Sequence, residues 1–335
     1  MKVLVTGAAG FLGGSIVQAL RSAGMDIRAL VRPGRTVEGN GVEVCHGDVC
    51  DADAVHAAVR DVEGVVHAAA RVATTGPWEA FADANVRATR RIIHAAHAAG
   101  ARRIVHISSL SVYAVPRDGV TITEESPYES EAHSRGAYSR SKLAADRVAL
   151  FEAGRGAPVV VLRPGLLYGP GKRPPLARQS VDAGGFKLIL ARPNYTLPLA
   201  YVDNTAAAVV QALQTDAAVG QAFTLVDENA RQNEYVSLYR SVSGERWRPL
   251  FLPVRLVALA ALGLERTLRL ARRRSPISYD QVRRATDRAW YDCSRAQRVL
   301  GWRPNVSVRE GLVRAFASLG GRDGSTPPQQ QETRH

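Results

Sequence analysis

The sequence has few of the features that mark secreted or membrane-spanning proteins. Its 335 residues include only 3 cysteines, too few for a fold held together by disulfides. No uninterrupted apolar run reaches the ~18–20 residues that a membrane-spanning helix needs. The chain starts with MKVLVTG rather than with a basic leader and an apolar stretch. We therefore expect a cytoplasmic protein whose thiols stay reduced.

Ligand sets for a metal ion are also lacking. Cys45, His46 and Cys50 stand close in the sequence, but no second half of a zinc-type ligand set follows them. His94 and His97 lie on an alanine-rich stretch without a carboxylate partner. We interpret all five as packing or surface residues and expect no metal.

Acidic residues are fewer than basic ones, 31 against 44, which gives a net charge of +13. Such a charge can indicate a nucleic acid, an anionic membrane surface or an anionic substrate. No basic run is interleaved with aromatic residues, and no nucleic-acid motif occurs. We expect a small-molecule substrate and no nucleic acid.

The first motif that is present is a glycine turn between a strand and a helix. The apolar run KVLVT is followed by GAAGFLGG and a helical pattern, the setting of a dinucleotide phosphate site. Gly7 permits the tight turn, Gly10 lets the backbone approach a pyrophosphate, and Gly13 lets the helix pack closely on the strand. The glycines are three apart, a variant of the usual spacing. We expect them, with Phe11 and Leu12, to bind the cofactor at the helix N-terminus.

The end of the second strand indicates which cofactor is bound. An acidic residue there binds the adenosine ribose, whereas an arginine accommodates a 2′-phosphate. This strand ends at Arg32, with Arg35 three residues on and no carboxylate. We predict a preference for NADP over NAD; the alternative is that Arg32 stacks on the adenine of either cofactor.

Strands and helices then alternate, which indicates a parallel doubly wound sheet. The strands VEVCHGDV, GVVHAAA, RRIVHIS and PVVVLRPG are separated by helical stretches that include 78–99 and 137–152. The predicted fold class is α/β: a Rossmann sheet with a smaller, mixed C-terminal substrate lobe. Further cofactor contacts are expected from Asp48, Val49, Ala68, Ala69, Ala70 and Asn85.

Residues 102–142 carry the candidate chemistry. Tyr138 and Lys142 are four apart and share one face of a helix. An ammonium beside a phenol favours phenolate, so we expect the pKa of Tyr138 to fall below its usual ~10. The phenol could then act as a general acid or base. Ser108 and Ser109 follow a strand, at the edge where open α/β sheets bind ligands.

Taken together, the motifs TGAAGFLG, GDV, HAAA, ISSLSVY, YSRSK and LRPGLLYGPG, in this order, resemble those of the extended short-chain dehydrogenase/reductases. The resemblance covers about residues 1–300. It implies a catalytic set of Ser109, Tyr138 and Lys142, with Ser108 the less favoured serine.

The same resemblance implies further cofactor contacts. Lys142 would also bind the nicotinamide ribose. The stretch Arg163-Pro164-Gly165 would lie beside the nicotinamide, and Pro164, Ser108 and Tyr138 are counted among the cofactor contacts.

The branch of the family is indicated by one stretch. Relatives that act on nucleotide-sugars usually carry an Arg-Asp-aromatic sequence where this chain has TLPLAYVDN, with Leu199 and Ala200. The arginine for a sugar-linked phosphate is missing, although Arg178, Lys187 or Arg192 could substitute. The chain looks more similar to the 3β-hydroxysteroid dehydrogenase and dihydroflavonol-reductase-like branch. That resemblance implies chemistry on a secondary alcohol or ketone of an apolar molecule.

After Gly165 the strand and helix patterns in the sequence become less regular. The last residues are polar and contain Gly and Pro, so we expect a disordered tail. The predicted units are an NAD(P)-binding domain over 1–165 with 201–226 returning to it, a substrate lobe over 166–200 and 227–318, and the tail over 319–335.

The segment 253–274, PVRLVALAALGLERTLRLARRR, is apolar first and arginine-rich afterwards. It is too short to span a bilayer, but it could lie in the membrane interface as a peripheral contact. It could equally be a buried or lid-forming helix whose terminal arginines suit the helix dipole. The sequence leaves both readings open.

These motifs predict an NAD(P)-dependent oxidoreductase that interconverts a secondary alcohol and a ketone on a largely apolar substrate, with Tyr138 as general acid/base. The alternative is a nucleotide-sugar epimerase or dehydratase that uses the same three residues and recycles its cofactor. A non-catalytic NADP-binding protein would have no need of Tyr138 and Lys142 at this spacing. The same resemblance implies a homodimer, because relatives commonly pair through two long helices, which here would be the alanine-rich stretches 78–99 and 134–152.

Overall fold

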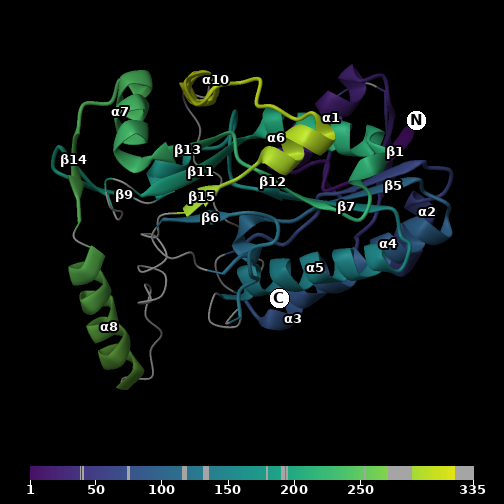
Figure 1. Ribbon diagram of the computed structural model, residues 1–335, viewed down its shortest axis with the longest axis horizontal. Coiled ribbons are helices and arrows are strands. Elements are labelled where there is room, and N and C mark those ends of the chain that lie inside the picture. Colours follow the sequence, from purple (N-terminus) through teal and green to yellow (C-terminus); the bar gives the residue numbers. More distant parts are fainter. Residues whose placement is uncertain are drawn as a thin grey trace.

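A seven-stranded parallel sheet forms the centre of the computed structural model (Figure 1), in the order β12-β7-β5-β4-β1-β2-β3. Its strands are β1 Lys2–Thr6, β2 Asp26–Val31, β3 Val42–His46, β4 Gly64–His67, β5 Arg103–Ile107, β7 Val159–Pro164 and β12 Ala222–Leu225. The structure describes the chain except residues 38, 40, 74–75, 115–118, 131–135, 179, 190–192, 194, 253, 271–288 and 321–335. The strand order reverses between β1 and β4, and ligands of such sheets bind at the carboxyl ends of the strands beside that point.

The central strands read as continuous apolar runs because both faces of the sheet are covered. In β1, Val3 and Val5 belong to one hydrophobic core and Leu4 to the other, and all three are fully buried. Each such side chain contributes roughly 1.5–3 kcal/mol by leaving water. The α/β fold class predicted from the sequence is confirmed.

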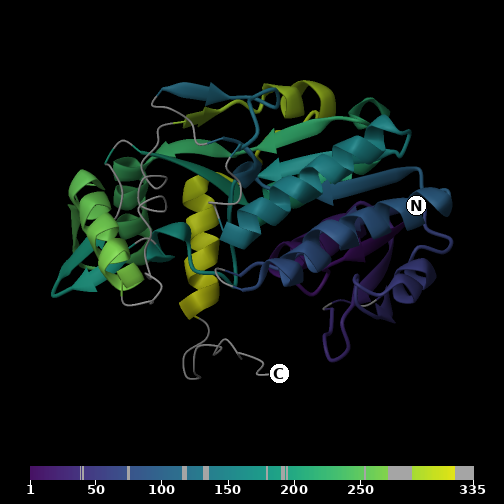
Figure 2. The same cartoon turned by 90° about the horizontal axis from the view of Figure 1, so that it is seen from below.

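Helices cover the two faces of the sheet, as Figures 1 and 2 show. On one face lie α1 (Phe11–Ser22) and α6 (Val202–Gln214), whose apolar residues join the core of Val3. On the other face lie α2 (Ala52–Ala58), α4 (Ala88–Ala98) and α5 (Gly136–Gly154). The sheet therefore lies between two layers of helices, and the carboxyl ends of its strands are not covered by these helices.

The helix expected over 78–99 is continuous but not uniform. It begins as α3 (Trp78–Phe81), passes through a π-helical segment (Ala82–Arg87) and ends as α4. Its last part lies beside α5 (Figure 2), whose Phe151 is exposed. Pairing of two chains through these helices stays a prediction.

Smaller sheets lie beyond the carboxyl ends of the central strands. They are β13-β11-β8, β14-β10-β9 and β15-β6. Their bounds are β6 Val120–Ile122, β8 Leu166–Tyr168, β9 Ser180–Ala183, β10 Phe186–Ile189, β11 Thr196–Tyr201, β13 Glu228–Arg231, β14 Arg248–Phe251 and β15 Ala289–Tyr291. The first two of these sheets, with α7 (Gln232–Ser243) and α10 (Val308–Gly320), enclose a third core rich in aromatic residues. The predicted domain boundaries stay predictions.

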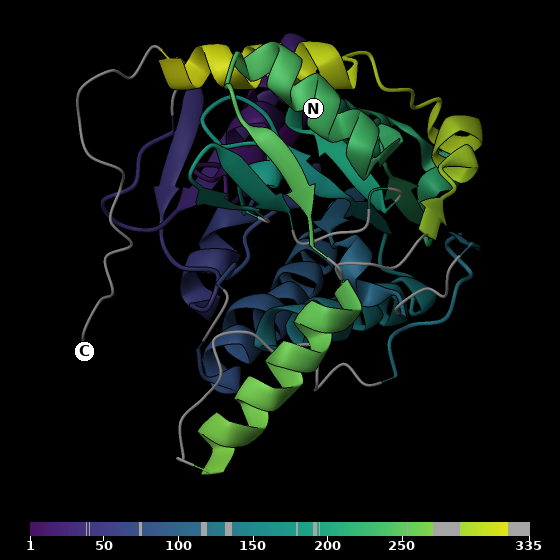
Figure 3. The same cartoon turned by 90° about the vertical axis from the view of Figure 1, so that its left-hand side faces the viewer.

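Helix α8 (Val254–Leu270) projects away from the rest of the structure in Figures 1 and 3. No helix in the part of the chain that the structure describes is both long and apolar enough to cross a membrane. Arg272, Arg273 and Arg274, and the predicted tail beyond residue 320, lie outside the described residues.

Candidate active site

A cavity of about 710 Å³ opens at the carboxyl ends of β1, β4, β5 and β7, within the size range of small-molecule sites. The cavity brings together predicted residues from five separate segments of the chain. They are Gly7, Gly10, Phe11, Leu12, Gly13, Ala68, Ala70, Ser108, Ser109, Tyr138, Lys142 and Pro164.

The glycine turn has no room for side chains. A Cβ on Gly7 would lie 2.7 Å from the Ala69 nitrogen, and one on Gly13 would lie 2.0 Å from the Gly7 carbonyl oxygen. Gly7 also has a φ of 74°, which glycine adopts most readily. Gly10 caps α1 without a side-chain hydrogen bond, and no acidic residue lies in the first turn. The open helix end and the bare turn therefore suit a phosphate group.

The residues after β4 are small, and a hydrogen bond to Thr6 of β1 holds their backbone in place. Ala68 and Ala70 line the cavity, whereas the Ala69 nitrogen donates to Thr6 Oγ1 at 3.3 Å. Asn85 is buried and does not belong to the lining. Its amide nitrogen donates to Ser141 Oγ at 2.8 Å, and its oxygen accepts from the Arg71 nitrogen at 2.7 Å. Asn85 therefore ties the loop after β4 to α5.

The two serines after β5 have different partners. The Ser108 hydroxyl donates to the buried carboxylate of Asp146. The Ser109 hydroxyl accepts a hydrogen bond from the Ser111 nitrogen at 3.1 Å and makes a side-chain hydrogen bond with Tyr138. Since the Ser109 oxygen already accepts, its hydrogen is available for the phenol or for a substrate oxygen.

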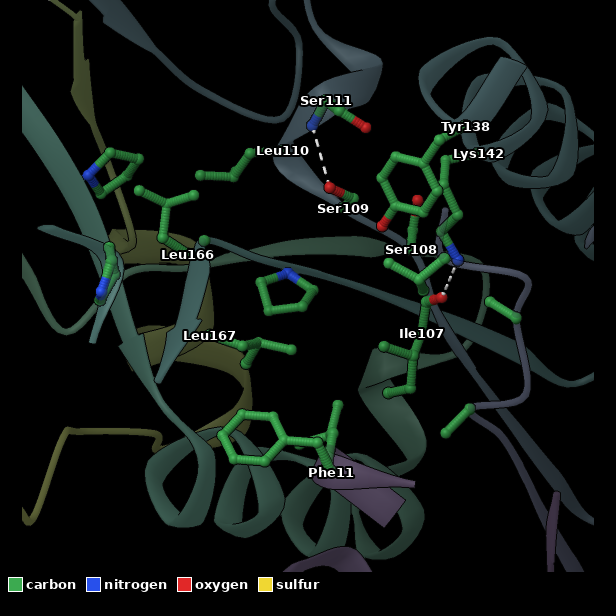
Figure 4. A pocket seen from close by; sticks show the side chains of 18 of the residues that line it. Phe11, Ile107, Ser108, Ser109, Leu110, Ser111, Tyr138, Lys142, Leu166 and Leu167 are labelled. Atoms are coloured by element: carbon green, nitrogen blue, oxygen red, sulfur yellow. Dashed lines mark hydrogen bonds between the residues drawn. The ribbon is translucent and has the colours of Figure 1, made fainter. Parts of the chain in front are cut away.

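Tyr138 and Lys142 project from α5 toward the end of β5, as Figure 4 shows. Lys142 is buried and its ammonium donates to the Ile107 carbonyl oxygen at 2.6 Å. Burial lowers the pKa of Lys142 to about 8, and the charge of Asp146 opposes this shift. Lys142 is thus charged near neutral pH but loses its proton far more easily than an exposed lysine.

The expected lowering of the Tyr138 pKa is wrong for this site. Burial raises the pKa of Tyr138, and the hydrogen bond from Ser109 opposes the rise. The cost of desolvating a phenolate exceeds the help from the Ser109 hydrogen bond. Tyr138 is therefore a protonated phenol at neutral pH.

A buried network behind the cavity was not foreseen from the sequence. Asp146, one turn after Lys142 on α5, accepts from Arg163 Nη2 at 2.7 Å and Nε at 3.0 Å, and from the Tyr128 hydroxyl at 2.8 Å. Arg163 Nη1 donates to the Tyr113 hydroxyl at 2.8 Å. The network fastens α5 to β7. Its only signal in the sequence is an acidic residue and an arginine inside otherwise apolar stretches.

The network also changes the position expected for one motif. Of the stretch after β7, Pro164 and Gly165 line the cavity. Arg163 does not: its side chain is 1% exposed and is paired with Asp146.

The substrate side of the cavity is mostly apolar. Figure 4 shows Leu166 and Leu167 across from Tyr138, with Phe11 below them. Lys172 and Arg173 also line the cavity, and none of its described lining residues is a carboxylate. Apolar walls with cations alone favour a substrate that is apolar, anionic or both.

Three predicted cofactor contacts lie outside this cavity, at the ends of β2 and β3. Arg32 is exposed just after β2. Asp48 Oδ1 accepts from the Cys50 nitrogen at 2.8 Å, and the Val49 carbonyl oxygen accepts from Arg91 Nη1 at 2.9 Å. Because these strands extend the row of carboxyl ends beyond β1, the residues stay predictions for the adenosine half of a dinucleotide.

The basic residues considered for a sugar-linked phosphate do not reach the cavity where they are described. Lys187 is buried, forms ion pairs at 3.3 Å with both Asp182 and Glu245, and lies over the Trp247 ring. Arg192 and the side chain of Arg178 lie outside the described residues. Leu199 and Ala200 are fully buried in β11.

Comparison with known proteins gives a family match. The sequence pattern of the NAD dependent epimerase/dehydratase family matches residues 3–225. The chain is 30% identical to 2-alkyl-3-oxoalkanoate reductase of Stenotrophomonas maltophilia, over 95% of this chain and 99% of that protein. It is 27% identical to 3β-hydroxysteroid dehydrogenase/Δ5→4-isomerase of Mycobacterium tuberculosis, over 93% of this chain and 88% of that protein. The expected resemblance is confirmed.

Solved structures share the fold. The complex of MoeE5 with UDP-glucuronic acid and NAD is similar with a TM-score of 0.73 and 25% identity, over 96% of this chain and 99% of that one.

Proposed function

The chain belongs to the NAD dependent epimerase/dehydratase family and is an NAD-dependent enzyme, and we propose that it reduces a ketone on a largely apolar substrate with NADP as the preferred cofactor. The reverse reaction is oxidation of the corresponding secondary alcohol. One observation carries the proposal: Ser109, Tyr138 and Lys142 converge on a cavity whose opposite wall is apolar.

The turn after β1 fits the cofactor. Gly7, Gly10 and Gly13 leave the backbone without side chains in front of the N-terminus of α1. The small side chains of Ala68 and Ala70, after β4, leave room for a ligand there. These residues would hold the dinucleotide phosphates. When bound, the nicotinamide supplies or accepts the hydride. Arg32, exposed at the end of β2 without a neighbouring carboxylate in sequence, would bind the 2′-phosphate.

Tyr138 suits proton donation to a ketone. Its raised pKa keeps the phenol protonated at neutral pH. The Ser109 hydroxyl would donate a hydrogen bond to the substrate oxygen as negative charge develops there. Tyr138 would then transfer its proton to that oxygen, which completes the alcohol. A protonated phenol in the free enzyme is the form that ketone reduction requires.

Lys142 has a positioning role in the described arrangement. Its bond to the Ile107 carbonyl oxygen and the bonds of Asp146 to Ser108 and Arg163 keep α5 against β5 and β7. By its resemblance to relatives, Lys142 would also hold the nicotinamide ribose. Its buried charge would stabilise the phenolate that remains after proton transfer.

The apolar wall separates this proposal from its main competitor. Leu166, Leu167 and Pro198 line the substrate side, and Leu199 and Ala200 stand where nucleotide-sugar relatives carry a basic residue. The relative named 2-alkyl-3-oxoalkanoate reductase supplies a first candidate substrate, a 3-oxoacid with alkyl chains. The 3β-hydroxysteroid dehydrogenase relative supplies a second, a 3-oxosteroid or its alcohol.

The experiment follows the absorbance of the reduced nicotinamide with these substrates. We expect stoichiometric oxidation of NADPH as the ketone is consumed. Tyr138→Phe should lower turnover by about 10²–10⁴-fold because the proton donor is lost, while NADPH affinity stays within about twofold. Full activity of Tyr138→Phe would contradict the mechanism.

A second candidate function is an epimerase or dehydratase of a nucleotide-sugar. Lys172 and Arg173 favour it, because both are cations in the lining and could bind a diphosphate. The MoeE5 complex with UDP-glucuronic acid supplies the test compound. Conversion of a UDP-sugar without net change in the nicotinamide absorbance would replace the first proposal with this one.

A further inference from the structure

The outer end of the substrate side exposes large apolar side chains on consecutive elements. On β10 and β14 these are Phe186 and Leu250, and on α8 they are Leu259 and Leu264, with Leu259 62% exposed. Strand β10 pairs with β14, and α8 follows β14 directly in the chain. We name these four residues the outer apolar surface.

The two strands turn one face outward. Phe186 lies opposite Arg248, and Leu188 lies opposite Leu250. Paired residues of neighbouring strands share a face, and alternate residues point the other way. Consistently, the alternate residues Lys187 and Ile189 are buried. The outward face therefore carries Phe186, Leu250 and an arginine rather than core contacts.

Helix α8 has few contacts with the other elements that the structure describes. It makes no extensive contact with any other helix or strand of the described chain, and Figure 3 shows it extending beyond the other elements. Its 17 residues give a length of roughly 25 Å. An amphipathic helix of this kind, too short to cross a bilayer, can lie along a lipid interface.

The charge around the outer apolar surface is positive. Helix α8 contains three arginines and one glutamate, and Arg246, Arg248 and Arg266 are exposed. The acidic residues Asp182 and Glu245 share the single cation Lys187, so this group leaves one net negative charge against the three exposed arginines.

The exposed apolar side chains and the excess of arginines favour an anionic lipid surface over a second copy of the chain. A two-fold contact would bring together two identical surfaces that each carry more arginines than carboxylates, so positive charge would be concentrated between the copies. An anionic bilayer instead accepts apolar side chains below its headgroups and arginines among them. We propose that α8 and the adjoining strand β14 dock on an anionic lipid bilayer, with α8 lying in the plane of the interface.

The test is sedimentation of the full chain with vesicles of phosphatidylcholine alone or mixed with phosphatidylglycerol. We expect binding to the mixed vesicles at about 0.05 M salt and weaker binding at about 0.5 M, because salt shortens the range of the attraction. The variant Leu259→Ser/Leu264→Ser should bind about tenfold or more weakly, because two apolar side chains no longer enter the lipid. Arg266→Glu should weaken binding to the mixed vesicles more than to phosphatidylcholine.

Matched controls lie elsewhere on the surface. Val219 and Val313 are also exposed apolar residues, and Arg298 is an exposed arginine. Val219→Ser/Val313→Ser and Arg298→Glu should bind like the unaltered protein. Equal losses in the controls would overturn the assignment to α8, and no binding of the unaltered protein to anionic vesicles would overturn the proposal itself.

Two further outcomes would assign the surface to something else. Light scattering could show that the unaltered protein is a dimer and that Leu259→Ser/Leu264→Ser is a monomer. Without vesicle binding, that result would make the outer apolar surface an interface between two copies of the chain. If the KM of Leu259→Ser/Leu264→Ser for a water-soluble ketone differs from that of the unaltered protein, again without vesicle binding, α8 would instead be a lid over the cavity. Vesicle binding is measured without substrate, so its failure leaves the proposed reaction untouched.

Discussion

The Lys142 ammonium donates to the Ile107 carbonyl oxygen at 2.6 Å, and this bond ties the helix that carries Tyr138 to the last residue of strand β5. Both partners are buried, so the charge is held away from water by the same contact that positions it. The pKa of Lys142, lowered by burial to about 8, indicates the cost of that arrangement.

Lys142→Met should abolish turnover yet stabilise the fold near pH 7. Because the folded-state pKa of about 8 lies below the usual value of 10.5, the unfolded chain holds the proton more tightly. The stability of the unaltered protein should therefore rise as pH increases from 8 to 10.5. A shift of this size corresponds to roughly 3 kcal/mol, partly offset by the lost bond to Ile107.

Urea unfolding at pH 7 and pH 10 checks this prediction. The advantage of Lys142→Met should be largest at pH 7 and should shrink toward pH 10. A methionine variant that is less stable at both pH values would show that the buried charge is not costly. Lys142→Arg is the control that keeps the charge.

Ser109→Ala and Ser108→Ala should affect different properties. Ser109 contacts Tyr138, so its loss should lower kcat by about 10²-fold, as for an oxyanion donor. Ser108 donates to Asp146, so its loss should cost about 1–3 kcal/mol of stability with kcat nearly unchanged. Steady-state kinetics and thermal unfolding of both variants distinguish the two roles; the reverse result would make Ser108 the catalytic serine.

Gly13→Ala should abolish NADPH binding or folding, whereas Gly14→Ala should do neither. The new Cβ at position 13 would lie 2.0 Å from the Gly7 carbonyl oxygen, while at Gly14 nothing lies within 4 Å. Alanine at Gly14, inside α1, should add up to about 1 kcal/mol of stability. Fluorescence titration with NADPH and thermal unfolding of both variants check the prediction, and normal NADPH binding by Gly13→Ala would contradict it.

Arg32→Asp should reverse the cofactor preference. A carboxylate at the end of β2 binds ribose hydroxyls and repels a 2′-phosphate, so we expect kcat/KM for NADPH to fall by about 10²-fold or more. Activity with NADH should hold or increase. Arg35→Asp serves as the neighbouring control, and an unaltered protein that already prefers NADH would remove the basis for the prediction.

The sequence predicted those parts of the site whose causes are local. The glycine turn follows from steric needs within seven residues, and Tyr138 and Lys142 follow from one helical turn. The shift in the pKa of Tyr138 was predicted in the wrong direction. The four-residue spacing places the Lys142 charge near the phenol, but it does not show how deeply the phenol is buried.

The buried network was missed for a related reason. Asp146 and Arg163 lie on a helix and a strand that meet only in the folded chain, and neither residue alone has a recognisable motif. The alternating strands predicted the central sheet well, whereas the partners of short strands such as β6 and β15 depend on contacts across 169 residues, from Val120 to Ala289.

The buried pair of Asp146 and Arg163 supports the catalytic residues and takes no part in the wall that faces the substrate. The groups that move protons are anchored to the central sheet, while the apolar wall comes from the loops and strands between Gly165 and Pro198. We expect that substitutions of their cavity-lining residues change substrate choice without disturbing the Asp146–Arg163 pair. For protein engineering, the segment between Gly165 and Pro198 is therefore the place to graft new substrate specificity onto an unchanged reaction.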